Sequence, residues 1–275
     1  MSAILADSGV TFSGVGKYLT TGSNWWGIDG LLVHIRDHVI YAAIIVLAAA
    51  LIALPVGLIV GHTGRGVVAV VGVANALRAV PTLGLIVLLY VWLAPKIPVN
   101  HGNVLFLHRG GVPTFIAVVI VLILLAVPPI LTNTYAGIQA VDPAVRDAAR
   151  GMGMRGSQVL RRVELPCALP LIISGLRNAT LQVIATLTVA AYVPGLGGLG
   201  RYIADGAEQA PAQGDPPMLS AAILVALLAV VVDGLLNLVQ RLVVSPGVSG
   251  RYSSKHTSQP GVTTAPLVEA QLTVA

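Results

Sequence analysis

The chain has 275 residues, of which 56% are hydrophobic and only 10% are charged, and its mean hydropathy is +0.87. So few charges cannot solvate a soluble domain, which is typically about 25% charged, so the composition predicts an integral membrane protein. The excess of basic residues does not indicate nucleic acid, because these residues stand at the ends of apolar runs rather than along one face. The single cysteine, Cys167, excludes an internal disulfide framework and a cysteine-based metal cluster.

Residues 1–37 are predicted to form a polar and interfacial segment ahead of the first span. A signal peptide is not expected, because no Lys or Arg precedes Lys17 and no compact apolar region is followed by a cleavage site. His34 and His38 are four residues apart, which is a metal-ligand spacing, and Asp37 lies beside them. Because a third convergent ligand is lacking, we expect an amphipathic helix at the lipid headgroups and no metal site.

The apolar runs predict an all-α bundle of five or six transmembrane helices within residues 38–243. The second run contains Arg78 and Pro81, and the proline is expected to kink it. We prefer five spans to six, because each half of a run split at Pro81 is too short to cross a bilayer. Gly57 and Gly61 form a GxxxG pattern that allows close helix contact, although the pattern is common by chance. The five predicted spans are 39–60, 66–93, 113–135, 169–191 and 218–239.

Charged, polar and kinking residues within or beside these spans are candidates for the lining of a transport pathway. For Arg78, a pathway role and simple pairing inside the bundle stay equally open. Asp233 lies close to Arg241, which favours pairing with an arginine over a role toward a cationic solute. The pathway candidates are Arg78, Pro81, Asn133, Tyr135, Arg177, Tyr192 and Asp233.

The loop 136–166 between the third and fourth spans carries helix signals at both ends. Asp142 is a favoured N-cap and Pro143 suits the first helical position, which predicts a helix over 143–150 that stops at Gly151-Met152-Gly153. Ser157 is expected to cap a second short helix, closed by Pro166. The residues alone leave two interpretations open: a folded loop whose arginines touch anionic lipid, and an element that docks into a partner.

Lysine and arginine counts predict the orientation in the membrane. The side of the 136–166 loop collects nine basic residues and the other side collects five, so the loop and the C-terminus are expected in the cytoplasm and the N-terminus outside. Residues 244–275 are rich in Ser, Thr and Pro and are expected to be a disordered tail. The nine basic residues are Arg65, Arg146, Arg150, Arg155, Arg161, Arg162, Arg241, Arg251 and Lys255; the five are Lys17, Arg36, Lys96, Arg109 and Arg201.

The loop contains Asp147-Ala148-Ala149, followed by Gly153 and then by Val163-Glu164-Leu165-Pro166. This pattern resembles the EAA loop of bacterial ABC importer permeases. That motif reads E-A-A, three residues, G, nine residues and I-x-L-P, and the spacing matches throughout. Asp147 stands in place of Glu, and Val163 in place of Ile. The resemblance implies a type I importer permease in the inner membrane, whose loop acts as a coupling helix for a cytoplasmic ATPase. The implied coupling residues are Asp147, Ala148, Ala149, Arg150, Gly151, Gly153, Met154, Leu165 and Pro166.

The resemblance also implies partners, because the chain has no phosphate-binding loop: Gly16-Lys17 lacks the first glycine and the Ser/Thr of that motif. ATP and Mg²⁺ are therefore expected on a separate ATPase dimer, and no cofactor or enzymatic activity is expected in this chain. A separate extracytoplasmic solute-binding protein is expected, together with a second permease chain that is either a copy or a paralogue.

The stretches 128–138 and 148–154, together with Gly175-Leu176-Arg177-Asn178-Ala179, resemble the osmoprotectant branch, which takes glycine betaine, carnitine or choline. The turn 191–198 departs from that branch, where relatives have more glycine and isoleucine. The alternatives are a permease for another solute such as methionine, and a secondary transporter driven by an ion gradient. The latter would need a relay of intramembrane carboxylates, and the predicted spans contain only Asp233.

Overall fold

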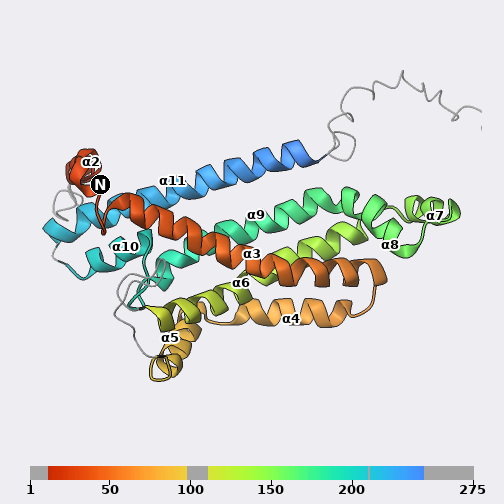
Figure 1. Ribbon diagram of the computed structural model, residues 1–275, viewed down its shortest axis with the longest axis horizontal. Helices are drawn as coiled ribbons and strands as arrows, with labels where there is room; N and C mark the ends of the chain where they lie inside the picture. Colours follow the sequence, from red (N-terminus) through yellow and green to blue (C-terminus); the bar gives the residue numbers. More distant parts are fainter. Residues whose placement is uncertain (1–11, 98–110, 210, 245–275) are drawn as a thin grey trace, which may run out of the picture.

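The computed structural model describes residues 12–97, 111–209 and 211–244, and these residues form helices joined by short turns (Figure 1). The sequence predictions for residues 245–275, and the positions of Arg109, Arg251 and Lys255, lie outside the described residues. The helices are α2 (Phe12–Thr20), η1 (Gly22–Asn24), α3 (Leu31–Thr63), α4 (Val67–Ala79), α5 (Thr82–Leu93), α6 (Val112–Gln139), α7 (Pro143–Gly151), α8 (Gly156–Val159), the π-helix η3 (Leu160–Glu164), α9 (Leu165–Ala190), α10 (Leu199–Ala207) and α11 (Pro211–Val243).

Four stretches are long and apolar enough to cross a membrane: α3, α6, the stretch Gly156–Ala190 that includes α9, and the part Asp215–Val243 of α11. The pair α4 and α5 passes the same test together, with a bend of 82° between its two halves. The predicted all-α polytopic bundle is therefore confirmed, with up to five spans. The break falls where the sequence places it, because Pro81 caps α5 and α4 ends at Ala79. Neither half reaches the roughly 30 Å of a hydrocarbon core by itself.

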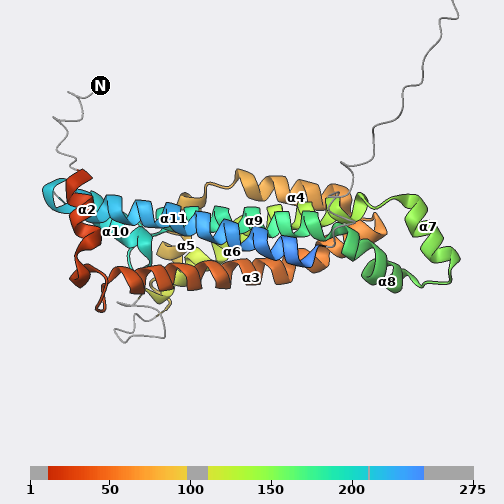
Figure 2. The same cartoon turned by 90° about the horizontal axis from the view of Figure 1, so that it is seen from above.

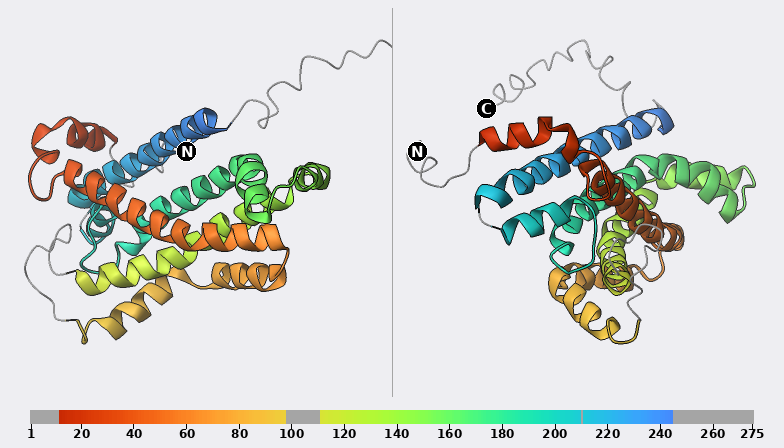
Figure 3. Two further views of the ribbon diagram at one scale, coloured as in Figure 1. Left: turned by 45° about the vertical axis from the view of Figure 1, so that its right-hand side comes forward. Right: turned by 60° about the vertical axis from the view of Figure 1, so that its left-hand side comes forward.

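The long helices lie side by side, and the short helices gather at the two ends of the bundle (Figures 1 and 2). α7 and α8 lie at one end, which we call the α7 end, and α2 and α10 lie at the other, which we call the α10 end. α3 and α9 both pack against α6, α11 packs along α9, and α4 and α5 flank α6 (Figure 3). The core between these helices is apolar and includes Tyr41, Ile45, Leu122, Ile130 and Leu187.

Glycines let α3 and α6 approach closely. A Cβ placed on Gly57 would lie 2.8 Å from the Thr134 Cβ, and one on Gly61 would lie 2.7 Å from the Ile138 Cβ. Both distances are shorter than real carbon contacts, so any larger side chain would push the helices apart. The GxxxG pattern is therefore a true helix contact in this chain.

The N-terminal part of α3 differs from the sequence prediction. α3 begins at Leu31, and it buries His34 and His38 rather than laying an amphipathic face on the headgroups. The His34 Nδ1 lies 3.0 Å from the Gly198 carbonyl oxygen, and the His38 Nε2 lies 3.0 Å from the Ile184 carbonyl oxygen. These carbonyls belong to α9 and to the turn before α10, and a pattern within one helix cannot reveal such distant partners.

Two predicted helix boundaries are wrong. Arg155, not Ser157, is the N-cap of α8, and its backbone N–H donates to the Gln158 side chain at 2.7 Å. Pro166 does not end the helix, which continues through η3 into α9. The π turn makes this continuation feasible, because the Leu165 N–H bonds to the Leu160 carbonyl and Pro166 occupies the first turn of α9. The helix α10, which follows the turn 191–198, is not predicted by the sequence.

Candidate functional site

The short helix α7 is defined by caps at both ends. The Asp142 side chain accepts a hydrogen bond from the Ala144 N–H at 2.9 Å, and Pro143 occupies the first turn. Beyond the helix, Gly153 has φ of +83°, which favours glycine, and the Met154 N–H returns to the Ala149 carbonyl at 3.2 Å. These caps confirm the helix that the sequence predicts, and they fix its direction at the end of the bundle.

The predicted coupling residues on α7 do not share one face. Asp147, Ala148, Arg150 and Gly151 are exposed, whereas Ala149 is 2% exposed and packs inward. The Asp147 and Arg150 side chains form an ion pair at 3.4 Å on the outer surface. The outer face of α7 is therefore available to a partner, and the buried Ala149 holds α7 to its own chain.

The remaining predicted coupling residues lie beside α7 or in the following helix. Gly153 is exposed and Met154 is half-buried in the turn. Leu165 packs against the small cluster of Ile138, Ala168 and Ile172, which joins the ends of α6 and α9. Pro166 is exposed.

The inner side of α7 meets a buried carboxylate that the sequence did not single out. Glu164, in η3, is 1% exposed. Its Oε2 lies 2.6 Å from the His62 Nδ1, and its Oε1 lies 3.0 Å from the Arg146 Nε. The sequence signals were weak: Glu164 occupies the variable position of I-x-L-P, and His62 looks like an ordinary residue of a polar turn. We call Glu164, His62 and Arg146 the Glu164 cluster.

Two of the intramembrane pathway candidates pair with each other. The Arg177 guanidinium on α9 donates two hydrogen bonds to the Asp233 carboxylate on α11, and the Nη2–Oδ2 distance is 2.5 Å. The expectation that an arginine pairs with Asp233 is confirmed, although the partner is Arg177 rather than Arg241. The pair crosses between two spans, where a desolvated charge requires a partner.

The other pathway candidates are scattered. Arg78, at the end of α4, is exposed, and its Nη2 lies 3.5 Å from the Thr132 Oγ1. Asn133 donates to the Pro129 carbonyl of its own helix at 2.8 Å and packs where α6 crosses Gly175. Pro81 is exposed, Tyr135 is half-buried, and Tyr192 is 52% exposed at the α10 end. The chain by itself does not bring these residues together in one cavity.

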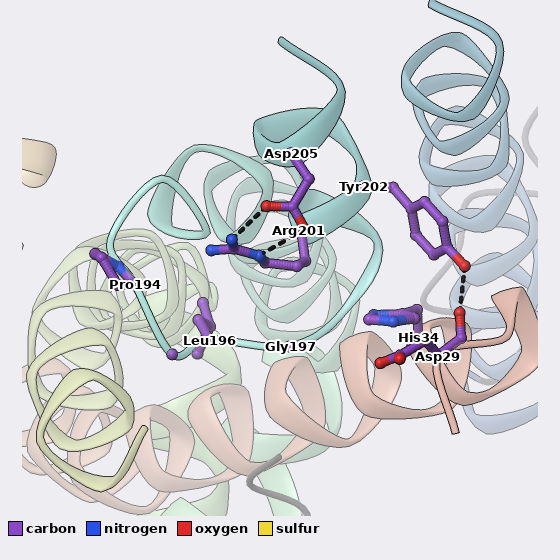
Figure 4. A pocket seen from close by; sticks show the side chains of 9 residues that line it. Asp29, His34, Pro194, Leu196, Gly197, Arg201, Tyr202 and Asp205 are labelled. Atoms are coloured by element: carbon purple, nitrogen blue, oxygen red, sulfur yellow. Dashed lines mark hydrogen bonds and ion pairs between the residues drawn. The ribbon is translucent and has the colours of Figure 1, made fainter. Parts of the chain in front are cut away.

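A polar pocket of about 330 Å³ lies at the α10 end, between the start of α3, the turn 194–198 and α10 (Figure 4). The Arg201 Nε donates to the Asp205 Oδ2 at 2.9 Å on its wall. Tyr202 donates to the Asp29 carbonyl and stacks edge-on against His34, with ring centroids 4.8 Å apart. Burial raises the pKa of the Tyr202 phenol, so it stays a neutral donor. No sequence motif marked this pocket.

Within the described part of the chain, no group of three or more His, Cys, Asp or Glu side chains is placed to hold a metal ion. His34 and His38 bond to backbone carbonyls instead.

A polytopic helical bundle that displays a short, doubly capped helix at one end has the architecture of the membrane permease of an ABC importer. The chain belongs to the family of binding-protein-dependent transport system inner membrane components, whose family model matches residues 53–245. It is thus a membrane-embedded transport subunit, and the family implies an ATPase and a solute-binding protein as partners.

Curated relatives cover most of the chain. It is 32% identical over 220 residues to the glycine betaine/carnitine/choline transport system permease protein OpuCB of Bacillus subtilis, which covers 80% of this chain and 91% of the relative. It is 35% identical over 205 residues to the carnitine transport permease protein OpuCD of Listeria monocytogenes, with coverage of 74% and 82%. It is 30% identical to the osmoprotectant import permease protein OsmW of Salmonella typhimurium, with coverage of 77% and 91%.

Among solved structures, the fold is similar to a chain of the MetNI methionine ABC transporter in an inward-facing conformation. The TM-score is 0.62 at 19% sequence identity, over 78% of this chain and 96% of that chain. At this level of identity the likeness establishes the fold.

Proposed function

We propose that this chain is the permease of an ATP-driven importer for quaternary ammonium osmoprotectants such as glycine betaine, choline or carnitine. The relatives at 30–35% identity support this solute class, because their names specify these solutes or osmoprotectants in general. The methionine alternative has weaker support, because the methionine transporter resembles this chain at 19% identity. A likeness of that kind carries a fold and not a substrate.

The observation that carries the coupling mechanism is the geometry of α7. The helix has caps at both ends and an outer face that includes Asp147, Ala148 and Arg150, and it lies at the tip of the bundle. An exposed helix held in this way fits the groove of a soluble partner. In our proposal α7 docks into one subunit of a cytoplasmic ATPase dimer, which binds the ATP and Mg²⁺.

The proposed orientation places the α7 end in the cytoplasm and the α10 end outside, where the solute-binding protein delivers its cargo. The distribution of basic residues supports this orientation. A second permease chain, either a copy or a paralogue, completes the pathway. The described basic residues of the α7 end are Arg65, Arg146, Arg150, Arg155, Arg161, Arg162 and Arg241, whereas Lys17, Arg36, Lys96 and Arg201 lie toward the α10 end.

Uptake by proteoliposomes that contain the complete transporter tests the solute class. Labelled choline and glycine betaine should accumulate with ATP and the binding protein, and excess unlabelled methionine should not compete. Methionine uptake without choline, betaine or carnitine uptake would contradict the proposal.

The same vesicles separate an ATP-driven importer from a secondary transporter. With an ATPase variant that binds but does not hydrolyse ATP, uptake should stop even when ion gradients are present. Uptake that continues with the inactive ATPase and collapses with the ion gradient would support the alternative class.

A further inference from the structure

The helix α3 lacks a direct chain connection to the loop that contains α7. α6 leads into that loop and α9 leaves it, so the backbone itself carries any movement of α7 to these two helices. α3 is separated from α7 in sequence by α4, α5 and α6. If α3 follows α7 when the transporter changes state, side chains must connect them.

The Glu164 cluster provides such a connection. Arg146 is on α7, His62 is in the last turn of α3, and the Glu164 carboxylate lies between them, at 3.0 Å from the Arg146 Nε and 2.6 Å from the His62 Nδ1. Because Glu164 is 1% exposed, its carboxylate oxygens contact these partners rather than water. A buried carboxylate shared between two elements resists their separation, since withdrawal of either partner would leave one of its buried oxygens without that partner.

Further hydrogen bonds connect the same elements through α6. The Arg146 guanidinium also donates to the Ile138 carbonyl in the last turn of α6. The Gln139 side chain donates to the Gly61 carbonyl at 2.6 Å, one residue before His62. α3, α6, α7 and η3 are therefore joined in a closed ring of polar contacts at the α7 end.

The π-helix η3 gives Glu164 its inward direction. A π turn accommodates one more residue than an α turn, so it rotates the residues on one side of it by about 100° relative to a continuous α-helix. Glu164 closes this segment and points inward, while Arg161 and Arg162 of the same segment are exposed. π segments of this kind occur frequently at functional sites.

We propose that Glu164 is a positioning residue that transmits movement of α7 to α3 through its paired contacts with Arg146 and His62. The outer face of α7 would meet the ATPase, and the opposite side holds Arg146 against Glu164. A displacement of α7 therefore moves the carboxylate, and His62 carries α3 with it. This inference rests on the proposed docking of α7, but it assigns the transmission to a residue outside the docking face.

The test uses the complete transporter in proteoliposomes, with Glu164→Gln and His62→Gln as variants. Glutamine preserves the size of Glu164 and removes its charge. Arg65→Gln is the matched control, because it removes an exposed cation from the turn that follows His62. Three quantities are measured for each: ATPase co-purified with the permease, ATP hydrolysed with loaded binding protein, and labelled choline transported per ATP.

We expect Glu164→Gln and His62→Gln to retain the ATPase at wild-type yield and to hydrolyse ATP. The choline transported per ATP should fall at least about three-fold, the scale at which residues between two sites change their coupling. The choline transported per ATP by the double variant should be no lower than that of the more impaired single variant, because both substitutions break the same connection. Arg65→Gln should keep the wild-type ratio.

The inference would be overturned if Glu164→Gln and His62→Gln transported as much choline per ATP as the wild type. This includes the case in which transport and hydrolysis fall equally, which indicates a purely structural role. If Glu164→Gln does not fold, His62→Gln decides, since the His62 side chain is 21% exposed and tolerates change better. Failure of the proposed function is a distinct result: the wild-type transporter would then show no ATP-dependent choline uptake.

Discussion

Replacement of His38 tests whether the paired histidines of α3 are structural. His38 is 1% exposed, and its Nε2 lies 3.0 Å from the Ile184 carbonyl of α9. His38→Ala removes one interhelical hydrogen bond and leaves a cavity. A buried bond contributes about 1 kcal/mol and large-to-small core substitutions cost roughly 2–5 kcal/mol, so we expect a loss of about 2–4 kcal/mol.

The assay is thermal unfolding of the purified chain in detergent, followed by tryptophan fluorescence. For a chain of this size, 1 kcal/mol corresponds to about 2–4 °C in Tm, so His38→Ala should lower Tm by roughly 5–15 °C. His38→Gln keeps a donor nitrogen and should lose less. Val39→Ala, at a neighbouring position that is 41% exposed, is the control and should change Tm little.

A Tm for His38→Ala within about 2 °C of wild type would refute this reasoning, because the buried bond would then contribute little. Zinc and EDTA give a second check. Neither should change the wild-type Tm, since both histidines already bond to carbonyls. A zinc-dependent rise that disappears in His38→Ala would instead identify a metal site.

Three further predictions concern helix packing, docking and the interhelical ion pair. Gly61→Val should lower the free energy of unfolding in detergent by about 1–3 kcal/mol, because even a Cβ at this position overlaps α6. Gly72→Val should leave this free energy unchanged, since nothing lies within 4 Å of a Cβ there, and equal losses in the two variants would contradict this reasoning. Ala148→Glu, on the exposed face of α7, should abolish co-purification of the ATPase without lowering Tm, and wild-type recovery would exclude docking there. Arg177→Asp should loosen α11, and Asp233→Arg in the same chain should restore Tm; a double variant no more stable than either single variant would contradict the pairing.

The sequence predicts the parts of this fold that depend on local chemistry. Apolar runs locate the spans, because only a continuous helix satisfies its backbone groups in lipid. Pro81 locates the break between α4 and α5, and Asp142 with Gly153 locates the limits of α7 and its turn, because each acts on its neighbouring backbone. The Gly57 and Gly61 contact also follows from a short pattern, once a second helix lies against it.

The parts that sequence reasoning misses depend on residues far apart in the chain. Ala149 and Ala148 are indistinguishable in the motif, yet only Ala149 is buried, because the fold of the loop decides which side of α7 faces inward. Glu164 reads as a variable residue, since its partners His62 and Arg146 come from distant segments. The π turn is equally hidden, because no residue pattern in 160–164 specifies an i+5 hydrogen bond.

The contacts of α3 change character along its length. Polar side chains hold its two ends: His34 and His38 at the α10 end, and His62 at the α7 end. Between these two groups, the contact with α6 includes the close glycine packing at Gly57, where helix atoms meet without a directional bond. Apolar packing permits small sliding, whereas the buried Glu164 carboxylate separates from its partners only at high cost. If α7 transmits force as we propose, we expect that force to reach α3 at its His62 end, while His34 and His38 hold the other end against α9 and the turn before α10.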